Sequence, residues 1–192
     1  SSVRTPVGKA KRGSLANVPP LDYGRDVFKG AVDRVKGLKI TDIEDLIIGC
    51  TTPEAEQGMN IAMQIGQAAG LGDSVTGVTI NRFCASGLQS IAMAHQAISC
   101  GHAQVLAAGG VESMSLLTLG GNNFVANPAL GSSFPDAYMN MGNTAEAVAH
   151  KYKISRTAMD KFSLASHEKA LLAITNSRLD RKSTRLNSSH LV

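Results

Sequence analysis

The segment NRFCASGLQSIAMAHQAISCGHAQVLAAGGVESMS, residues 81–115, decides the fold that we expect for this chain. It overlaps VTGVTINRF (75–83), whose alternating β-branched residues predict a strand. Residues 85–100 then predict a helix that Gly101 ends. One face of that helix carries Leu88, Ile91, Ala92, His95 and Ile98. The apolar run AQVLAAGG (103–110) predicts another strand, and a strand, a helix and a strand in this order indicate a parallel βαβ unit.

Helices and strands also alternate in the residues before this segment. A helix is predicted over residues 22–36, with Asp22 as its N-cap, and DLIIGC (45–50) predicts a short buried strand. After a polar loop, residues 60–69 have the pattern of another helix. We interpret the order up to residue 110 as βαβαβαβ, which predicts an α/β fold with helices packed on a largely parallel sheet.

The chain changes character after this alternation. Residues 111–141 are rich in glycine, asparagine, proline and serine, and are too long for a plain connection in a compact domain. Because loops of this length usually serve a site, we expect this one to do so. Two helices are predicted after it, one over residues 143–152 and one from Ser155 to Thr175.

The last residues of the chain do not resemble what precedes them. Residues 180–192 begin with DRKSTRLNSSH, which is polar, unpatterned and similar to the translation of a common sequencing adapter. We therefore predict a sequencing-adapter or cloning scar, with a natural disordered tail as the alternative. This interpretation divides the chain into a core domain over residues 1–115, an incomplete loop domain with helices over 116–179, and the scar.

The composition favours a folded domain and excludes several classes of protein. An apolar fraction of 43% with only 18% charged residues argues against disorder. The net charge of +4 is not gathered on a basic helix face, so we expect no nucleic acid partner, while a small anionic ligand remains open. The chain has no run of about 18 apolar residues, so no membrane span is predicted. The spacing of Cys50, Cys84 and Cys100 matches neither a disulfide framework nor a zinc site, so no metal is expected.

Cys84 is the candidate nucleophile. It lies where the predicted strand ending at Phe83 passes into the helix beginning near Ala85. The unpaired N–H groups and the positive dipole end of a helix N-terminus stabilise a thiolate. Ser86 and Gly87 keep the first helical turn small, so that a bulky thioester can approach the backbone. The alternative is that Cys84 is a small buried residue at a strand end.

Residues 81–115 closely resemble the nucleophile segment of thiolases. In that family the pattern is Asn-Arg-x-Cys-x-Ser-Gly-Leu-Gln, a helix, and then Ala-Gly-Gly-x-Glu-Ser-Met-Ser. Further resemblances lie at VRTPVGK (3–9), PEAEQGMNIA (53–62) and MGNTAEAVAHKYKISRTAMDKFSLASHEKA (141–170). They occur in the family's order and spacing, and together they cover nearly all of residues 1–176.

The resemblance implies the thiolase fold, which has two similar halves of βαβαβαββ type with layered helices on a mixed sheet. We expect this chain to supply most of the first half and the start of the loop domain inserted in it, and to lack the second half. It also implies that Cys84 attacks the 3-keto carbon of a 3-oxoacyl-CoA. Acetyl-CoA then departs, and the thiol of coenzyme A takes the acyl group from sulfur.

Three functions follow as alternatives. PEAEQGMNIA favours a degradative enzyme, the 3-ketoacyl-CoA thiolase of fatty acid β-oxidation, which is an acetyl-CoA C-acyltransferase. The first alternative is a biosynthetic acetoacetyl-CoA thiolase, which condenses two acetyl-CoA molecules. The second is a non-catalytic truncated fragment, because the family's activating histidine, oxyanion site and second cysteine lie in the other half. The chain alone is therefore expected to be inactive and poorly soluble.

Several further residues have predicted roles. Met141 matches a family methionine that lines the acyl and pantetheine pocket, with a capping hydrophobe at a helix entry as the alternative. Gly109 and Gly110 end a strand beside the nucleophile, where close packing would exclude side chains. Glu112 and Ser113 are expected to anchor the following turn by hydrogen bonds. Cys50 and Cys100 are predicted to be structural. No role is assigned to four histidines that match no catalytic histidine of the family and are expected to be packed or solvated on helices or turns: His95, His102, His150 and His167.

The resemblance also predicts ligands, partners and location. No cofactor is expected, because coenzyme A is a substrate, and the small-molecule partners are coenzyme A thioesters. A homodimer or homotetramer is expected for the parent protein, with membership of a β-oxidation complex as an extension. The location would be cytoplasmic in a bacterium and mitochondrial or peroxisomal in a eukaryote.

Overall fold

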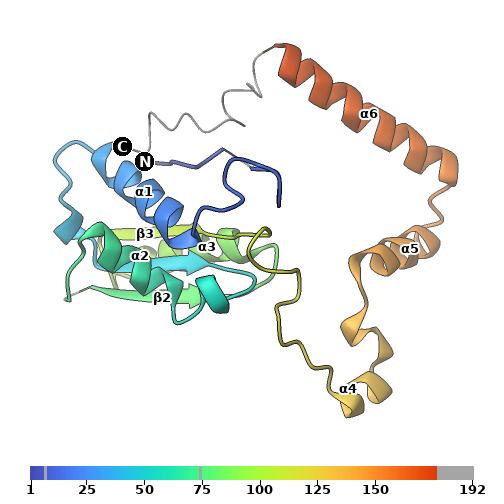
Figure 1. Ribbon diagram of the computed structural model, residues 1–192, viewed down its shortest axis with the longest axis horizontal. Helices are drawn as coiled ribbons and strands as arrows, with labels where there is room; N and C mark the ends of the chain where they lie inside the picture. The colour runs from blue at the N-terminus through green and yellow to red at the C-terminus, as the bar shows by residue number, and fades with distance from the viewer. Residues whose placement is uncertain (7, 74, 177–192) are drawn as a thin grey trace. The chain divides into compact units, whose positions relative to one another are not determined.

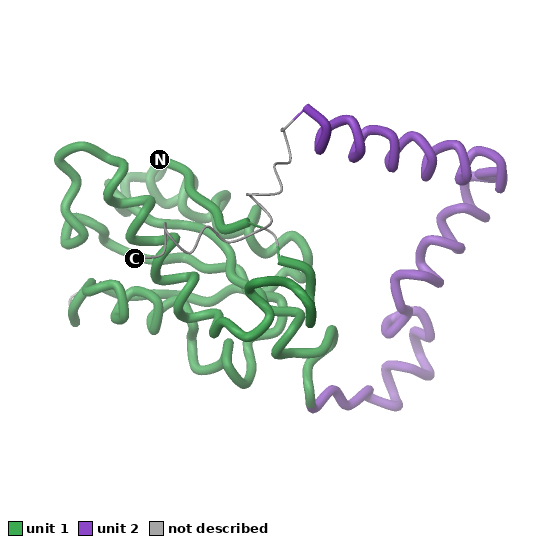
Figure 2. The backbone as a smooth tube through the Cα atoms, turned by 45° about the horizontal axis from the view of Figure 1, so that its top comes forward, with its two compact units in different colours: residues 1–122, 182–192 green, residues 123–181 purple. Residues whose placement is uncertain are grey.

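The computed structural model describes residues 1–6, 8–73 and 75–176 (Figure 1). The described residues form two units, one up to Asn122 and one from Asn123 onward (Figure 2). The division of the chain at residues 115 and 116 stays a prediction. The predicted scar at residues 180–192 lies outside the described residues.

The first unit is built on a parallel sheet of three strands. These are β1 (Asp45–Gly49), β2 (Thr76–Ile80) and β3 (Leu106–Gly110), in the order β2-β1-β3. Strands β2 and β3 both pair with β1 in the parallel direction. The central strand β1 is the most buried of the three, as its continuous apolar run predicts. The predicted α/β class is confirmed.

The described residues do not contain the first strand of the predicted βαβαβαβ order. The order in this unit is α1, β1, α2, β2, α3, β3, and the sheet has no antiparallel strand among the residues described. Residues 10–18 form turns and bends instead, and the chain before α1 has prolines at positions 6 and 19 and glycines at 8 and 13. Proline lacks the N–H of a ladder and glycine weakens a strand, so this stretch favours turns. The mixed sheet that the resemblance implied is likewise not formed in this part.

Helices cover both faces of the sheet. Successive side chains of β1 point to opposite faces, so Leu46 and Gly49 mark different sides. Helix α2 (Ile61–Ala69) packs over Leu46, and α1 (Pro20–Asp33) packs on α2. Helix α3 (Ser86–Ser99) lies against β1 and β3 on the face marked by Gly49 (Figure 1). Two short 3₁₀ helices, η1 (Ile40–Asp42) and η2 (Ala55–Gln57), precede and follow β1.

The hydrophobic core lies between the α1–α2 pair and the sheet. Its largest fully buried side chains include Leu46, Ile61 and Ile65. The other buried members of the cluster are Tyr23, Phe28, Val32, Ile43, Ile48, Cys50, Ala62, Ala69, Leu71, Val75 and Val111. This core holds the sheet in place, and the candidate site residues follow the C-terminal ends of its strands.

Helix α1 begins earlier than predicted. It starts at Pro20 with Pro19 at the N-cap position, so Asp22 lies in the first turn and is not the cap. Proline suits the first helical position because the missing N–H would be unpaired there in any case. The helix ends at Asp33 rather than at residue 36. By contrast, α2 ends at Gly70 in the left-handed conformation, as glycine after a helix predicts.

The second unit consists of helices. They are α4 (Pro128–Ser133), the 3₁₀ helix η3 (Pro135–Tyr138), α5 (Met141–Lys151) and α6 (Arg156–Thr175). Asn140 caps α5, because its Oδ1 accepts the Asn143 N–H at 2.8 Å, so α5 begins before the predicted residue 143. The predicted start of α6 is confirmed, since the Ser155 hydroxyl oxygen accepts the Ala158 N–H at 3.2 Å. In the part of the chain that the structure describes, no helix is long and apolar enough to cross a bilayer.

Candidate active site

Cys84 lies in a tight turn between β2 and α3. Its side chain is exposed, and α3 begins at Ser86. The Ala85 N–H donates to the Arg82 carbonyl oxygen at 3.1 Å, and the Ser86 N–H donates to that of Phe83 at 3.0 Å. The thiol is therefore open to solvent at the N-terminal end of a helix, and the alternative of a buried residue at a strand end is wrong.

The residue before Cys84 has a strained backbone. Phe83 has φ of +46°, in the left-handed region, and its ring is 72% exposed. This conformation costs a residue other than glycine about 1–2 kcal/mol. Polar groups on both sides of the residue hold it, because the Phe83 N–H donates to Asn81 Oδ1 at 2.8 Å and the Phe83 carbonyl accepts from the Thr51 hydroxyl at 3.0 Å.

Ser86 closes the same turn from the helix side. Its hydroxyl donates to the Phe83 carbonyl oxygen at 2.6 Å and accepts the Arg82 N–H at 2.8 Å. Its side chain is buried, whereas Gly87 faces open space where a Cβ would stand. A small, open first turn is what the sequence predicts here. The approach of a thioester to it stays a prediction.

Among the glycines of the sheet, Gly49 leaves the least space for a Cβ. A Cβ on Gly49 would lie 2.4 Å from the carbonyl carbon of Ser86, so this position has no room for a side chain. At Gly110 a Cβ would lie 3.5 Å from Gly87 Cα, and at Gly109 it would lie 3.8 Å from an Ile48 methyl group, both ordinary contacts. Tight packing was predicted at Gly109 and Gly110 at the end of β3, but the tightest contact is at Gly49 at the end of β1. A glycine inside a strand pattern is the signal that marks such an approach.

Helix α3 is packed against the sheet by small side chains. Its buried residues are Ser86, Ser90 and Ala94, and Ser90 Oγ lies 2.7 Å from the carbonyl oxygen of Gly109. The opposite face is apolar and exposed, with Leu88 at 73% and Ile91 at 55%. Only small residues fit at the glycine-lined strand ends, so the larger apolar ones point away.

Behind the turn, Glu112 connects the ends of β1 and β3. Its Oε2 accepts the Thr51 N–H at 2.6 Å, and its Oε1 accepts the side-chain amide of Gln57 at 2.7 Å. Gln57 is fully buried, and its Oε1 accepts the Ser113 N–H at 2.6 Å. Glu112 and Ser113 therefore make the hydrogen bonds expected of them. The partners Thr51 and Gln57 were not predicted, because only the strand order brings them to Glu112.

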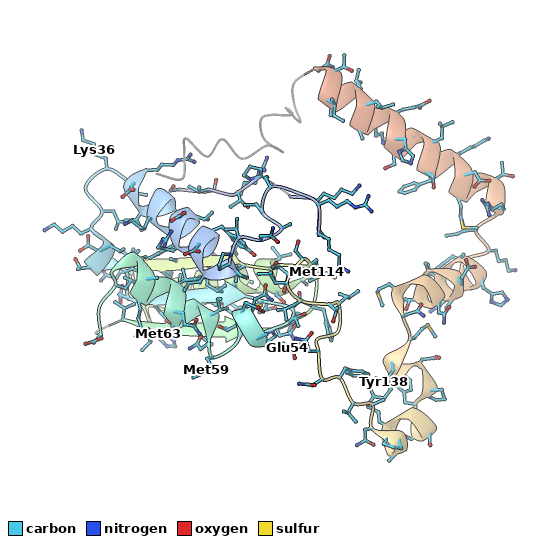
Figure 3. The ribbon with its side chains drawn as sticks, viewed as in Figure 1. Lys36, Glu54, Met59, Met63, Met114 and Tyr138 are labelled. Carbon is cyan, nitrogen blue, oxygen red and sulfur yellow. The ribbon has the colours of Figure 1, made fainter. Side chains whose placement is uncertain are left out.

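The loop after β1 is also tied to the end of the first unit. Figure 3 shows Glu54 on this loop and Met59 further along it. The Glu54 carboxylate accepts the Asn122 N–H. Met59 is 92% exposed, and both it and Asn60 have left-handed backbone conformations.

The other cysteines differ from Cys84 in their surroundings. Cys50 is buried, and this burial, with a further contribution from the negative charge of Glu112, raises the pKa of its thiol to about 12. Cys50 is therefore a neutral thiol at physiological pH, as a structural residue should be. Burial likewise raises the pKa of Tyr23 to about 12, and its hydroxyl donates to the Glu112 carbonyl oxygen at 2.9 Å. Cys100 is exposed at the C-terminal end of α3, where the helix dipole is negative.

The remaining predicted residues lie on helices or turns. Met141 is the first residue of α5 in the second unit and is 69% exposed, and its pocket role stays a prediction. The four histidines are all exposed: His95, His102, His150 and His167. Among the described residues, no group of three or more histidine, cysteine, aspartate or glutamate side chains could hold a metal ion.

The chain was compared with known families and proteins. The family model described as thiolase, N-terminal domain, matches residues 1–183. The 3-ketoacyl-CoA thiolase of Bacillus subtilis (strain 168) is 49% identical over 178 residues, which are 93% of this chain and 45% of that protein. The 3-ketoacyl-CoA thiolase of Saccharophagus degradans is 38% identical over 93% of this chain and 46% of its own length. That of Pseudoalteromonas translucida is 36% identical over 94% and 46%.

The chain spans about half the length of the curated relatives that it matches. The matched residues include the turn with Cys84, the glycine-lined strand ends and the helices of the second unit. The resemblance predicted from residues 81–115 is therefore confirmed, and the chain belongs to the thiolase family, in the part formed by its N-terminal domain.

Proposed function

We propose that this chain carries the nucleophile of an acyltransferase that cleaves a 3-oxoacyl-CoA into acetyl-CoA and a shortened acyl-CoA. One observation carries the proposal: Cys84 is exposed in a tight turn at the N-terminus of α3, within a chain 49% identical to a protein named 3-ketoacyl-CoA thiolase. The names of the relatives support the degradative direction over the biosynthetic one.

The proposed reaction has two transfers. The Cys84 thiolate attacks the 3-keto carbon, the bond between C2 and C3 breaks, and the electron pair leaves on C2 of acetyl-CoA, which takes up a proton. The acyl group is then held as a thioester on Sγ. The thiol of coenzyme A loses its proton, attacks this thioester and releases Cys84 as a thiolate. Coenzyme A is a substrate throughout, so the proposal includes no cofactor.

The residues of this chain supply the nucleophile and hold its position. Cys84 lies at the N-terminal end of α3, and the hydrogen bonds of Phe83 with Thr51 and Ser86 hold the turn in one conformation. The base that activates Cys84 and the acid that protonates acetyl-CoA would come from the half of thiolases that this chain does not cover. A homodimer or homotetramer acting on fatty acid β-oxidation intermediates completes the proposal.

The test is to trap the acyl-enzyme on the full-length protein with this N-terminal sequence. The enzyme is mixed with a 3-oxoacyl-CoA in the absence of free coenzyme A, quenched with acid, digested and analysed by mass spectrometry. We expect the acyl mass on the Cys84 peptide, its loss in Cys84→Ala, and its retention in the matched control Cys100→Ala. Acylation of another residue in the wild type, or steady thiolysis by Cys84→Ala, would contradict the proposal. Activity confined to four-carbon substrates would instead favour the biosynthetic enzyme.

A further inference from the structure

The peptide that precedes Cys84 is held from a distant part of the chain. The Phe83 carbonyl accepts the Ser86 N–H and hydroxyl, which are local, and also the hydroxyl of Thr51 at 3.0 Å. Thr51 follows β1, whereas Phe83 follows β2. Parallel pairing of β1 with β2 brings the two residues to the same end of the sheet.

Thr51 is itself held by two further contacts. Its N–H donates to Glu112 Oε2 at 2.6 Å, and its carbonyl accepts the Asn81 side-chain amide at 3.0 Å. Asn81 in turn accepts the Phe83 N–H on its Oδ1 at 2.8 Å. The strand ends of β1, β2 and β3 are thus joined through Thr51 to both sides of the Phe83 backbone.

This connection determines the orientation of one peptide plane. The Phe83 carbonyl and the Cys84 N–H belong to the same trans peptide, so they point in opposite directions in one plane. Holding the carbonyl toward Thr51 and Ser86 therefore fixes the direction of the Cys84 N–H and the position of its Cα. Because Phe83 is strained at φ of +46°, a residue without such support would relax to another conformation.

Resting on the proposed function, we propose that Thr51 is a positioning residue for the nucleophile. Its hydroxyl holds the Phe83–Cys84 peptide in the orientation that acyl transfer requires, and Glu112 holds Thr51. A small displacement of a nucleophile from its reacting geometry lowers the rate of attack with little effect on substrate binding. The rate of Cys84 acylation should therefore fall when the hydroxyl is removed, while KM stays unchanged.

Two variants of the full-length enzyme separate the hydroxyl from the shape of the side chain. Thr51→Val removes the hydroxyl and keeps the branched shape, and Thr51→Ser keeps the hydroxyl. Thr118→Val is the matched control, because the Thr118 hydroxyl also donates to a backbone carbonyl, that of Gly121, at 3.0 Å. Each protein is assayed for thermal midpoint, for the rate of acyl-Cys84 formation, for KM, and for alkylation of Cys84 by iodoacetamide without substrate.

Thr51→Val is expected to slow acylation and alkylation of Cys84 about two- to tenfold, the effect of one net hydrogen bond. KM and the thermal midpoint should match those of Thr118→Val, and Thr51→Ser should stay close to the wild type. Wild-type rates in Thr51→Val, or equally slow rates in Thr51→Ser, would overturn the inference. A wild type that forms no acyl-Cys84 contradicts the proposed function instead, and the alkylation rates then still decide the role of Thr51.

Discussion

Gly49 of the central strand lies directly against the backbone of Ser86 at the start of α3. A Cβ at Gly49 would lie 2.4 Å from the Ser86 carbonyl carbon and 2.7 Å from the Gly87 nitrogen. These are backbone atoms of a helix terminus, which cannot rotate away as a flexible side chain can. The position of the Cys84 turn relative to the sheet therefore depends on the absence of a side chain at position 49.

Gly49→Ala should destabilise the protein and displace the Cys84 turn. Overpacking of this kind costs about 1–3 kcal/mol. We expect a lower denaturation midpoint and slower iodoacetamide labelling of Cys84. Gly109→Ala is the matched control, because its Cβ would meet only an Ile48 methyl group at 3.8 Å. Equal midpoints for the two variants would show that the helix terminus moves freely.

Phe83→Gly should stabilise the fold while it impairs the site. Glycine adopts a positive φ without the strain of a side chain, and the Phe83 ring is 72% exposed, so little burial is lost. A gain of about 0.5–1 kcal/mol in the free energy of unfolding is expected, together with slower acylation of Cys84 because the turn becomes less rigid.

Lys153→Gly is the control for that substitution. Lys153 also has a positive φ, of 54°, but it follows α5 in the second unit. It should give a similar gain in stability with no change in acylation. Denaturant titration and the quenched acylation assay measure the two effects. Unchanged or faster acylation in Phe83→Gly would show that the rigidity of this turn does not limit the acylation rate.

The stability of the protein should fall as the pH rises above about 9, partly because of Cys50. Its pKa is raised from 9.0 to about 12 in the fold, so between these values the unfolded thiol ionises while the folded thiol stays protonated. The contribution is complete below pH 9 and is lost through pH 12. Cys50→Ala should therefore show a smaller decline in urea midpoint than the wild type over this range.

Tyr23 adds a decline of the same sign to both proteins. Its pKa is raised from 10.0 to about 12, so its effect begins at a higher pH than that of Cys50. The comparison is therefore clearest just above pH 9, before the Tyr23 effect begins. Parallel declines in the wild type and in Cys50→Ala would mean that the buried thiol does not contribute.

The isolated chain should aggregate through the exposed apolar face of α3. Leu88 and Ile91 are more than half exposed on that face, and neighbouring Ile98 is 44% exposed. Continuous apolar patches of this kind promote association. Replacing Leu88 and Ile91 by glutamine should raise the concentration at which light scattering begins. Met59→Gln is the control, because Met59 is 92% exposed and lies outside α3, and an equal gain there would exclude α3 as the cause.

Iodoacetamide should label Cys84 first among the three cysteines. Cys84 and Cys100 are both exposed, so access alone does not distinguish them. They lie at opposite ends of α3, and a helix dipole attracts negative charge at its N-terminus and repels it at its C-terminus. Cys50 should react last, because it is buried and its pKa is raised. Peptide mass spectrometry at short times measures the order, and equal labelling of Cys84 and Cys100 would contradict it.

Local patterns in the sequence were sufficient to predict most helices and strands and the place of Cys84 between a strand and a helix. Helix α6 begins after Ser155 and α2 ends at Gly70, because caps act through neighbouring backbone groups. The place of Cys84 was also predictable from local sequence, because the apolar spacing changes from alternating to helical at this point of the chain. Local signals are ambiguous where two capping residues lie close together, as Asn140 and Asn143 do. Helix α5 begins after Asn140 rather than at residue 143.

Only the tertiary structure decided which face of α3 is buried and which residues hold the turn at Cys84. The apolar residues Leu88 and Ile91 are exposed. The small residues of α3 are buried instead, because Gly49 meets the backbone at the start of the helix and Ser90 Oγ lies 2.7 Å from the Gly109 carbonyl oxygen. Thr51 and Glu112 are far apart in sequence, and they meet because β1 lies between β2 and β3. The sequence by itself determined the α/β class, the family and the position of Cys84. The strand order decided that Thr51 and Glu112 hold the turn at Cys84, because hydrogen bonds between strand ends depend on which strands are neighbours.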